Sequence, residues 1–198
     1  MRNHLFLLAI ATAGGAAILS CSPDRISTPT GGPEFSRGGV PPSPGPATYE
    51  YHAGDASRPA LNSPDVAMAS NGDKIVLTGT GTLRVFPKAV TGGGTFTHKN
   101  AAGTVLATGT WTATQLLTFQ SYGASTLRPP TFRAGLALIR VHLSPAGGAG
   151  LDATLRITCH LPKTDVPGGF EEGIRLAVDN AVNFNREVSG NTLFIFVP

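Results

Sequence analysis

Hydrophobic and polar residues alternate along most of the chain beyond residue 72, which is the pattern of β-strands. Between Lys74 and Phe86, apolar residues alternate with polar ones, mainly threonines, so one face of the predicted strand faces a core and the other faces water. Gly79 and Gly81 fall on the apolar face. Glycines in mid-strand are typical of a bend, a bulge or the close approach of a large side chain, and we expect packing rather than a ligand to explain them.

The clearest hairpin follows this strand. Residues 94–99 and 104–112 flank a short loop, Asn-Ala-Ala-Gly, whose end residues tolerate positive φ. With Lys99 opposite Thr104, one face of the hairpin faces the core and the other is a threonine-rich surface. The extended pattern continues for several more residues, too many for one straight strand, so a break is predicted at 113–115. The predicted core-facing residues are Phe96, His98, Val105, Ala107 and Trp111.

A second hairpin is predicted from residues 133–143 and 151–161, which are joined by a glycine-rich loop. Alternation places its aliphatic residues on one side and its charged residues on the other. The chain ends in residues 193–197, which are apolar on both faces and therefore suit a central or closing strand. The aliphatic set of the hairpin is Ala137, Ile139, Val141, Leu143, Leu155, Ile157, Cys159 and Leu161.

These elements predict an all-β domain, an antiparallel meander of about seven or eight strands joined by short turns, without an amphipathic helix. We favour an up-and-down barrel over a two-sheet sandwich, because successive hairpins make sequence neighbours spatial neighbours and closure removes free edges. The domain is predicted to span residues 73–198. Residues 49–72 are an ambiguous lead-in, in which Tyr49 and Tyr51 fit a short edge strand.

The N-terminus follows a different pattern. A basic residue precedes an apolar run, residues 5–19, that is too short and too rich in glycine and alanine for a membrane span and fits an export signal. The run ends in Ile-Leu-Ser before Cys21, which resembles the lipobox of bacterial lipoproteins, although Leu19 is bulkier than is common there. The resemblance implies that residues 1–20 are removed as a signal peptide and that Cys21 becomes an acylated first residue. The alternatives are an ordinary secretory signal and an uncleaved anchor.

Residues 21–48 are rich in proline, glycine and serine, with too few apolar groups to offset the entropy of ordering. We therefore expect a lipidated N-terminus followed by a disordered tether, which leads through the lead-in to the β domain. Acyl chains on Cys21 would hold the domain on a membrane without a spanning helix. With Cys21 acylated, Cys159 has no partner within the chain, so the exported domain must be stable without a disulfide.

Charge and motifs argue against several classes of function. The net charge of +3 at pH 7 is small and dispersed, without basic runs interleaved with aromatic residues, which argues against a nucleic-acid partner. Residues 79–84 begin like a dinucleotide-binding motif but lack the third glycine and a following helix. We recognise no nucleophile or zinc motif, and the histidines are not spaced as converging ligands. We therefore assign no catalytic residue, no metal site and no cofactor.

Two groups of residues are candidate ligand contacts. Phe96 and Trp111, with the two mid-strand glycines, would line a cavity for a small apolar ligand if the barrel is hollow. Arg140, His142 and Arg156 share the outer face of the second hairpin with an aspartate. They form either a site for an anionic ligand or a surface salt-bridge network.

An anchor, a spacer and a β domain without catalytic motifs predict an exported lipoprotein, held on the bacterial cell envelope through Cys21. We expect its domain to be a binding or interaction module for a small apolar or anionic ligand or for an envelope protein, and we favour this role over catalysis. One alternative is a small β-barrel enzyme with isomerase-like or cyclase-like chemistry, which needs few catalytic groups. Another is a structural protein of the envelope. Polar groups with perturbed pKa values inside a cavity would favour the enzyme, and a dry apolar interior would oppose it.

Overall fold

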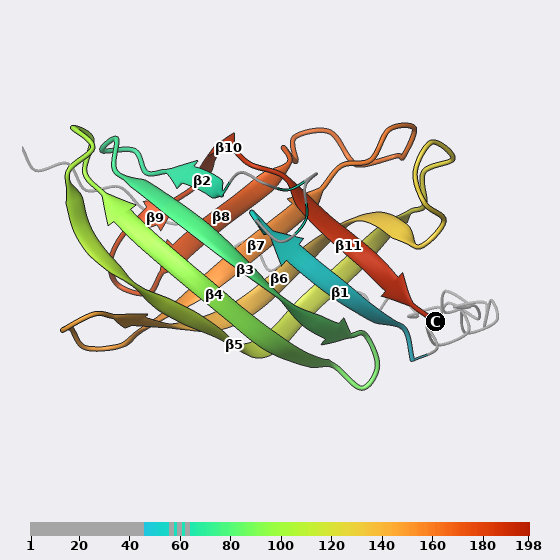
Figure 1. Ribbon diagram of the computed structural model, residues 1–198, viewed down its shortest axis with the longest axis horizontal. Helices are drawn as coiled ribbons and strands as arrows, with labels where there is room; N and C mark the ends of the chain where they lie inside the picture. Colours follow the sequence, from blue (N-terminus) through green and yellow to red (C-terminus); the bar gives the residue numbers. More distant parts are fainter. Residues whose placement is uncertain (1–45, 56–57, 59–60, 62–63) are drawn as a thin grey trace, which may run out of the picture. The chain divides into compact units, whose positions relative to one another are not determined.

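A computed structural model of the chain describes residues 46–55, 58, 61 and 64–198. The predicted signal peptide, the acylation site at Cys21 and nearly all of the predicted tether lie outside the described residues. The described part is all-β and antiparallel, as predicted, and its strands form one 11-stranded sheet (Figure 1). No helix among the described residues is long and apolar enough to cross a bilayer.

The sheet has more strands than the pattern of alternation indicated. The additional strands are short or lie in the lead-in, where a period of two is too brief to recognise. In chain order the strands are β1 (Thr48–Ala53), β2 (Asp65–Met68), β3 (Lys74–Arg84), β4 (Ala89–Lys99), β5 (Val105–Gly123), β6 (Phe132–Pro145), β7 (Leu151–Cys159), β8 (Gly173–Val178), β9 (Asn183–Phe184), β10 (Arg186–Ser189) and β11 (Thr192–Val197).

Strands β3 to β9 form the predicted meander, in which each strand pairs with the next. Strands β1 and β11 then close a circuit, because β1 pairs with both β3 and β11, and β11 pairs with the start of β6. In the circuit β1–β3–β4–β5–β6–β11, the contact between β11 and β6 consists of two residue pairs, and strands β9 and β10 lie at the ends of the sheet. The C-terminal strand β11 is thus a closing strand, as its apolar sequence predicted. Tyr49 and Tyr51 lie in the interior strand β1 and not at an edge.

The faces predicted from alternation are the buried faces. In β6 and β7, Ile139 lies opposite Leu155 and Ala137 opposite Ile157, and all four side chains are fully buried. Nearly all of the buried apolar residues of the sheet belong to one continuous core, with Ala134 and Leu136 of β6 outside it. Burial of each large aliphatic or aromatic side chain in that core contributes roughly 1.5–3 kcal/mol, so the core can stabilise the domain without a disulfide.

The first hairpin, β4 with β5, has a different register near its turn from the one expected. Lys99 pairs with Val105, not with Thr104, and a bulge separates this pair from the preceding one. The faces of Phe96 and Trp111 are preserved, and both side chains are buried. The bulge instead turns Val105 outward, where it is 52% exposed.

Strand β5 does not end where a break was predicted. It continues through residues 113–115, but its register against β6 shifts between Ala113 and Gln115 and again at two later points. Bulges bend a strand and increase its twist, so a long strand can follow a curved sheet without ending. The sequence therefore predicted the position of the irregularity correctly, but the irregularity is a bulge within one strand and not a break between two strands.

The antiparallel strands give the domain two ends. The β4–β5, β6–β7 and β8–β9 turns lie at one, which we call the hairpin end, on the left of Figure 1. The β3–β4 turn, the β5–β6 loop and the C-terminus lie at the other, which we call the terminal end, on the right of Figure 1. The chain also enters the sheet at the terminal end, where the backbone amide of Val85 donates to the carbonyl of Ala47 over 2.9 Å.

Candidate functional site

An apolar cavity lies at the hairpin end. Its volume is about 240 Å³, and its wall is formed by core-facing side chains near the ends of β3 to β9. Every residue of the wall is apolar except His98. The lining residues are Ile75, Phe96, His98, Ala107, Leu143, Pro145, Leu151, Leu176, Val178, Ala181, Val182 and Phe184.

The cavity exists because small residues stand where the strands stop. Ala107 near the start of β5 and Ala181 in the β8–β9 turn contribute only a methyl group each to the wall. The larger neighbours Phe96 and Phe184 lie in β4 and β9 and supply aromatic surface. The space between them is thus lined by carbon atoms from several strands, which favours an apolar occupant.

His98 brings the one ionisable group to this wall. Its Nε2 atom lies 3.2 Å from Oδ2 of Asp73, just before β3. Its ring also meets Phe184 edge to face, with centroids 5.3 Å apart and an interplanar angle of 84°. The imidazole is therefore held at the rim of the cavity by one polar and one aromatic contact.

The structure separates the two aromatic residues that the sequence grouped as cavity residues. Phe96 lines the apolar cavity, but Trp111 does not. The indole is 1% exposed and its Nε1 donates to the carbonyl of Thr78 over 3.0 Å. A Cβ on Gly79 would lie 2.3 Å from Cζ2 of this indole, so the glycine is needed for the ring to pack against β3.

Gly81 has the same function for a second ring. A Cβ there would lie 2.6 Å from the hydroxyl oxygen of Tyr51, which donates to the carbonyl of Thr91 over 2.9 Å. Burial raises the pKa of the Tyr51 phenol, so it stays a donor. Aromatic side chains thus occupy the space that the sequence had offered to a ligand, and the expectation that packing explains the two glycines is met.

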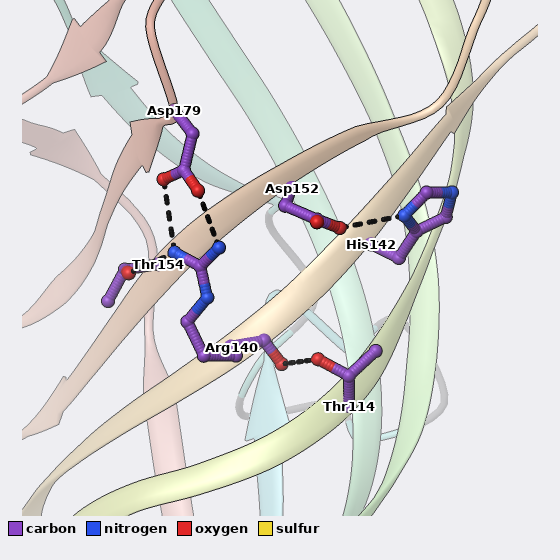
Figure 2. A network of polar contacts seen from close by, with 6 residues as sticks. All are labelled: Thr114, Arg140, His142, Asp152, Thr154 and Asp179. Carbon is purple, nitrogen blue, oxygen red and sulfur yellow. Dashed lines mark hydrogen bonds and ion pairs between the residues drawn. The ribbon is translucent and has the colours of Figure 1, made fainter.

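A polar network covers the outer face of the second hairpin (Figure 2). Arg140 donates to both carboxylate oxygens of Asp179, over 3.0 and 2.5 Å, and to Oγ1 of Thr154 over 3.0 Å. The hydrogen bond from Arg140 lowers the pKa of the Asp179 carboxyl. Beside them, Nδ1 of His142 lies 2.8 Å from Oδ1 of Asp152. Arg140 and His142, the two predicted ligand contacts in this network, therefore each already have a carboxylate partner.

Arg156 lies further along the same face and belongs to a separate cluster. It donates to Oε1 of Glu187, which also accepts from Nε of Arg175 over 2.7 Å. Its guanidinium lies 5.3 Å from the ring centroid of Phe170, within the range of a cation–π contact. Burial lowers the pKa of Arg156, and the charge of Glu187 opposes that shift. This cluster joins β7, β8 and β10 and leaves none of its charges alone.

Sequence reasoning missed the buried carboxyl group of Asp65 and interpreted the partly buried Glu172 as a solvated residue. Asp65 is 0% exposed and, among the described residues, neither of its carboxyl oxygens has a hydrogen-bond partner. Burial, and then the charge of Glu172, raise its pKa to about 8. Burial also raises the pKa of Glu172, which accepts from the backbone amides of His160 and Thr192. The burial of Asp65 could have been inferred from strand alternation, because residues two apart share a face of the sheet and Asp65 precedes the buried Ala67 by two residues in β2.

Neither the Cys159 thiol nor any metal-ligating cluster adds a second candidate site among the described residues. Burial raises the pKa of the Cys159 thiol to about 12, which keeps it protonated in the core. The described part of the chain contains no group of three or more His, Cys, Asp or Glu side chains arranged to hold a metal ion. No protein-family model, curated protein or solved structure matches the chain.

Proposed function

We propose that this chain is an exported lipoprotein, anchored on the bacterial cell envelope through Cys21, whose β domain binds a small apolar group in the cavity at the hairpin end. The observation that supports the binding role is the lining of that cavity, in which His98 is the one ionisable residue. Small-molecule sites in proteins combine apolar walls with a few placed polar groups. The cavity has both.

The size of the cavity narrows the class of ligand. An apolar cavity of about 150 Å³ lined by Leu, Ile and Phe takes up benzene. The larger volume of about 240 Å³ suits a single ring with a short substituent. With Nε2 of His98 engaged by Asp73, Nδ1 can accept a hydrogen bond at the rim from a hydroxyl group of that substituent.

Two groups with strongly raised pKa values lie outside the cavity and therefore do not support catalysis in it. Asp65 and Cys159 have pKa values raised to about 8 and about 12, but neither lines the apolar cavity. General acid–base catalysis needs such groups within hydrogen-bond reach of the substrate. The paired charges of the outer face likewise favour a structural network there over a site for an anionic ligand.

Titration of the full chain with toluene, followed by NMR of methyl groups, tests the binding role. Shifts are expected for Leu176 and Val182 in the wall. Ala107→Phe should fill the space and abolish these shifts, whereas Ala102→Phe, the same change at an exposed position in the β4–β5 turn, should leave them unchanged. Equal responses of both variants, or no response of the wall methyls in the unmodified chain, would contradict the proposal.

A further inference from the structure

Two large apolar side chains protrude from the terminal end of the domain. Phe86, in the β3–β4 turn, and Leu127, in the β5–β6 loop, are each 61% exposed. Val197, at the end of β11, is 39% exposed at the same end. Exposed apolar residues are ordinary, and Val105, Leu106 and Leu151 are exposed near the hairpin end, so the terminal end is distinguished by the charge around its apolar side chains.

The segments around these side chains are basic. They carry Arg84, Lys88, Arg128 and Arg133, and they contain no aspartate or glutamate. Three of these cations donate to backbone carbonyls, with Arg84 bonded to Pro87 over 3.2 Å and Lys88 to Leu117 over 2.5 Å. These contacts hold the side chains but leave their charge uncompensated. The segments are 46–48, 84–88, 124–133 and 194–198.

One further loop at this end, residues 160–172, is mixed in charge. It carries Lys163 with Asp165, Glu171 and Glu172. The carboxylate of Glu172 is turned toward the sheet, where backbone amides donate to it. The acidic groups that remain exposed in this loop, Asp165 and Glu171, are outnumbered by the five cations of the terminal end.

The chain outside the described residues joins the domain at this end. Residue 46 is the first one described, and β1 begins at Thr48 beside Arg84 and Val197. A tether between Cys21 and residue 46, as the sequence predicts, would allow several orientations of the domain over a membrane. A surface at this end with its own affinity for lipid would select one of them.

We infer that the terminal end docks on an anionic lipid surface, with Phe86 and Leu127 entering the interface and the basic side chains facing the headgroups. The inference rests on the proposed anchor at Cys21 and adds a second, independent contact to it. Apolar side chains combined with basic ones are what interfacial binding to anionic lipid requires. In this orientation the apolar cavity at the hairpin end faces away from the membrane.

Two tryptophan reporters in the full chain test this orientation. Phe86→Trp places a reporter at the terminal end, and Leu106→Trp places one at a comparably exposed position near the hairpin end. The native Trp111 is buried and gives a constant background. On vesicles of phosphatidylcholine and phosphatidylglycerol with brominated chains, the first reporter should shift to shorter wavelength and be quenched, and the second should not. Equal responses of both reporters, or none from the first, would overturn the inference.

The charge requirement is tested separately. In the Phe86→Trp background, Lys88→Gln should lower the ratio of docked to undocked protein about fivefold on anionic vesicles, because one basic residue near such a surface contributes about 1 kcal/mol. An unchanged ratio, or equal docking on pure phosphatidylcholine, would contradict a role for charge. Intact-mass analysis of the same sample reports acylation of Cys21, so failure of the anchor is distinguished from failure of docking.

Discussion

Asp65 combines complete burial with a carboxyl group that has no hydrogen-bond partner among the described residues. Its pKa is raised from 3.8 to about 8, first by burial and then by Glu172. The folded protein therefore keeps a proton at pH 7 that the unfolded chain releases. Between about pH 4 and pH 8 the folded state binds more protons than the unfolded state, so the free energy of unfolding falls as pH rises through this window.

Asp65→Asn should remove this dependence. In the unmodified chain, the Asp65 proton contributes a fall of about 1.4 kcal/mol in the free energy of unfolding for each pH unit between 5 and 7. The variant should show a clearly flatter dependence, with a remaining slope of the same sign from Glu172, whose pKa is also raised. Urea unfolding at pH 5, 6, 7 and 8 measures the slopes. Asp165→Asn, at an exposed position, should keep the original slope; equal slopes for both variants would contradict the assignment.

A substitution at Gly79 tests how tightly the indole of Trp111 packs against β3. In Gly79→Ala, the new methyl group would meet Cζ2 of the indole at 2.3 Å and the carbonyl oxygen of Gly93 at 2.6 Å. Because the ring and the neighbouring strand must both shift, the free energy of unfolding should fall by about 1–3 kcal/mol or more. Gly168→Ala is the matched control, since its Cβ would meet no atom within 4 Å. A tolerated Gly79→Ala would show that the indole can move freely.

At the scale of strands, the sequence predicted which face of each strand is buried more accurately than it predicted which strands pair with one another. A period of two is a local property, so the buried faces of β6 and β7 followed from alternation alone. The pairing of β1 with β11 joins Thr48 to Val197, and no local pattern records such a distant contact. The interior place of β1 was missed for this reason, and the Val105 bulge was missed because a register shift depends on the twist of the partner strand.

The sequence predicted that the residues lining the candidate cavity face the core, but it did not predict that a space remains between them. Phe96, Leu176, Val178 and Phe184 stand at positions that alternation assigns to the core. Whether core side chains fill the end of a sheet depends on where neighbouring strands stop relative to one another, and sequence spacing does not fix this. Gly79 shows the opposite case. The sequence left space for a ligand beside this glycine, but in the structure the indole of Trp111 fills that space.

Strand β10 depends on one buried carboxylate. It has only four residues and pairs with β2, while Glu187 links it to Arg156 on β7 and Arg175 on β8. Glu187→Gln should lower the free energy of unfolding by about 2–3 kcal/mol, because it leaves two arginines unpaired, one of them largely buried. Faster hydrogen exchange of the β10 amides should accompany the loss, and urea unfolding measures it.

An exposed ion pair provides the comparison for that prediction. Asp179→Asn weakens the contact with Arg140, in which Asp179 is 46% exposed. Exposed ion pairs contribute little because solvent screens them, so stability and the exchange of β10 should hardly change. If both variants lose the same stability, burial of the Glu187 cluster is not what stabilises β10.

At the scale of the whole molecule, the two ends of the domain have different surfaces. Both ends expose apolar side chains, but at the terminal end these lie among cations that have no carboxylate partner among the described residues, whereas the hairpin end has a cavity with an apolar wall. Because the chain from Cys21 arrives at the terminal end, anchoring and docking would act on the same side of the domain. A ligand in the cavity would then approach from the aqueous side, without competing with the membrane contact.

This arrangement depends on acylation of Cys21, which a single substitution tests. Each buried methylene group contributes about 0.8 kcal/mol, and stable attachment takes two or more chains, so the docking surface alone should not retain the protein. Cys21→Ala should therefore move the chain from the membrane pellet to the soluble fraction. Cys159→Ala removes the other thiol, which is buried in the core, and should leave the protein in the pellet. Retention of the Cys21→Ala chain in the pellet, or a wild-type mass with residues 1–20 attached and no acyl chains, would mean that another feature holds the protein on the membrane.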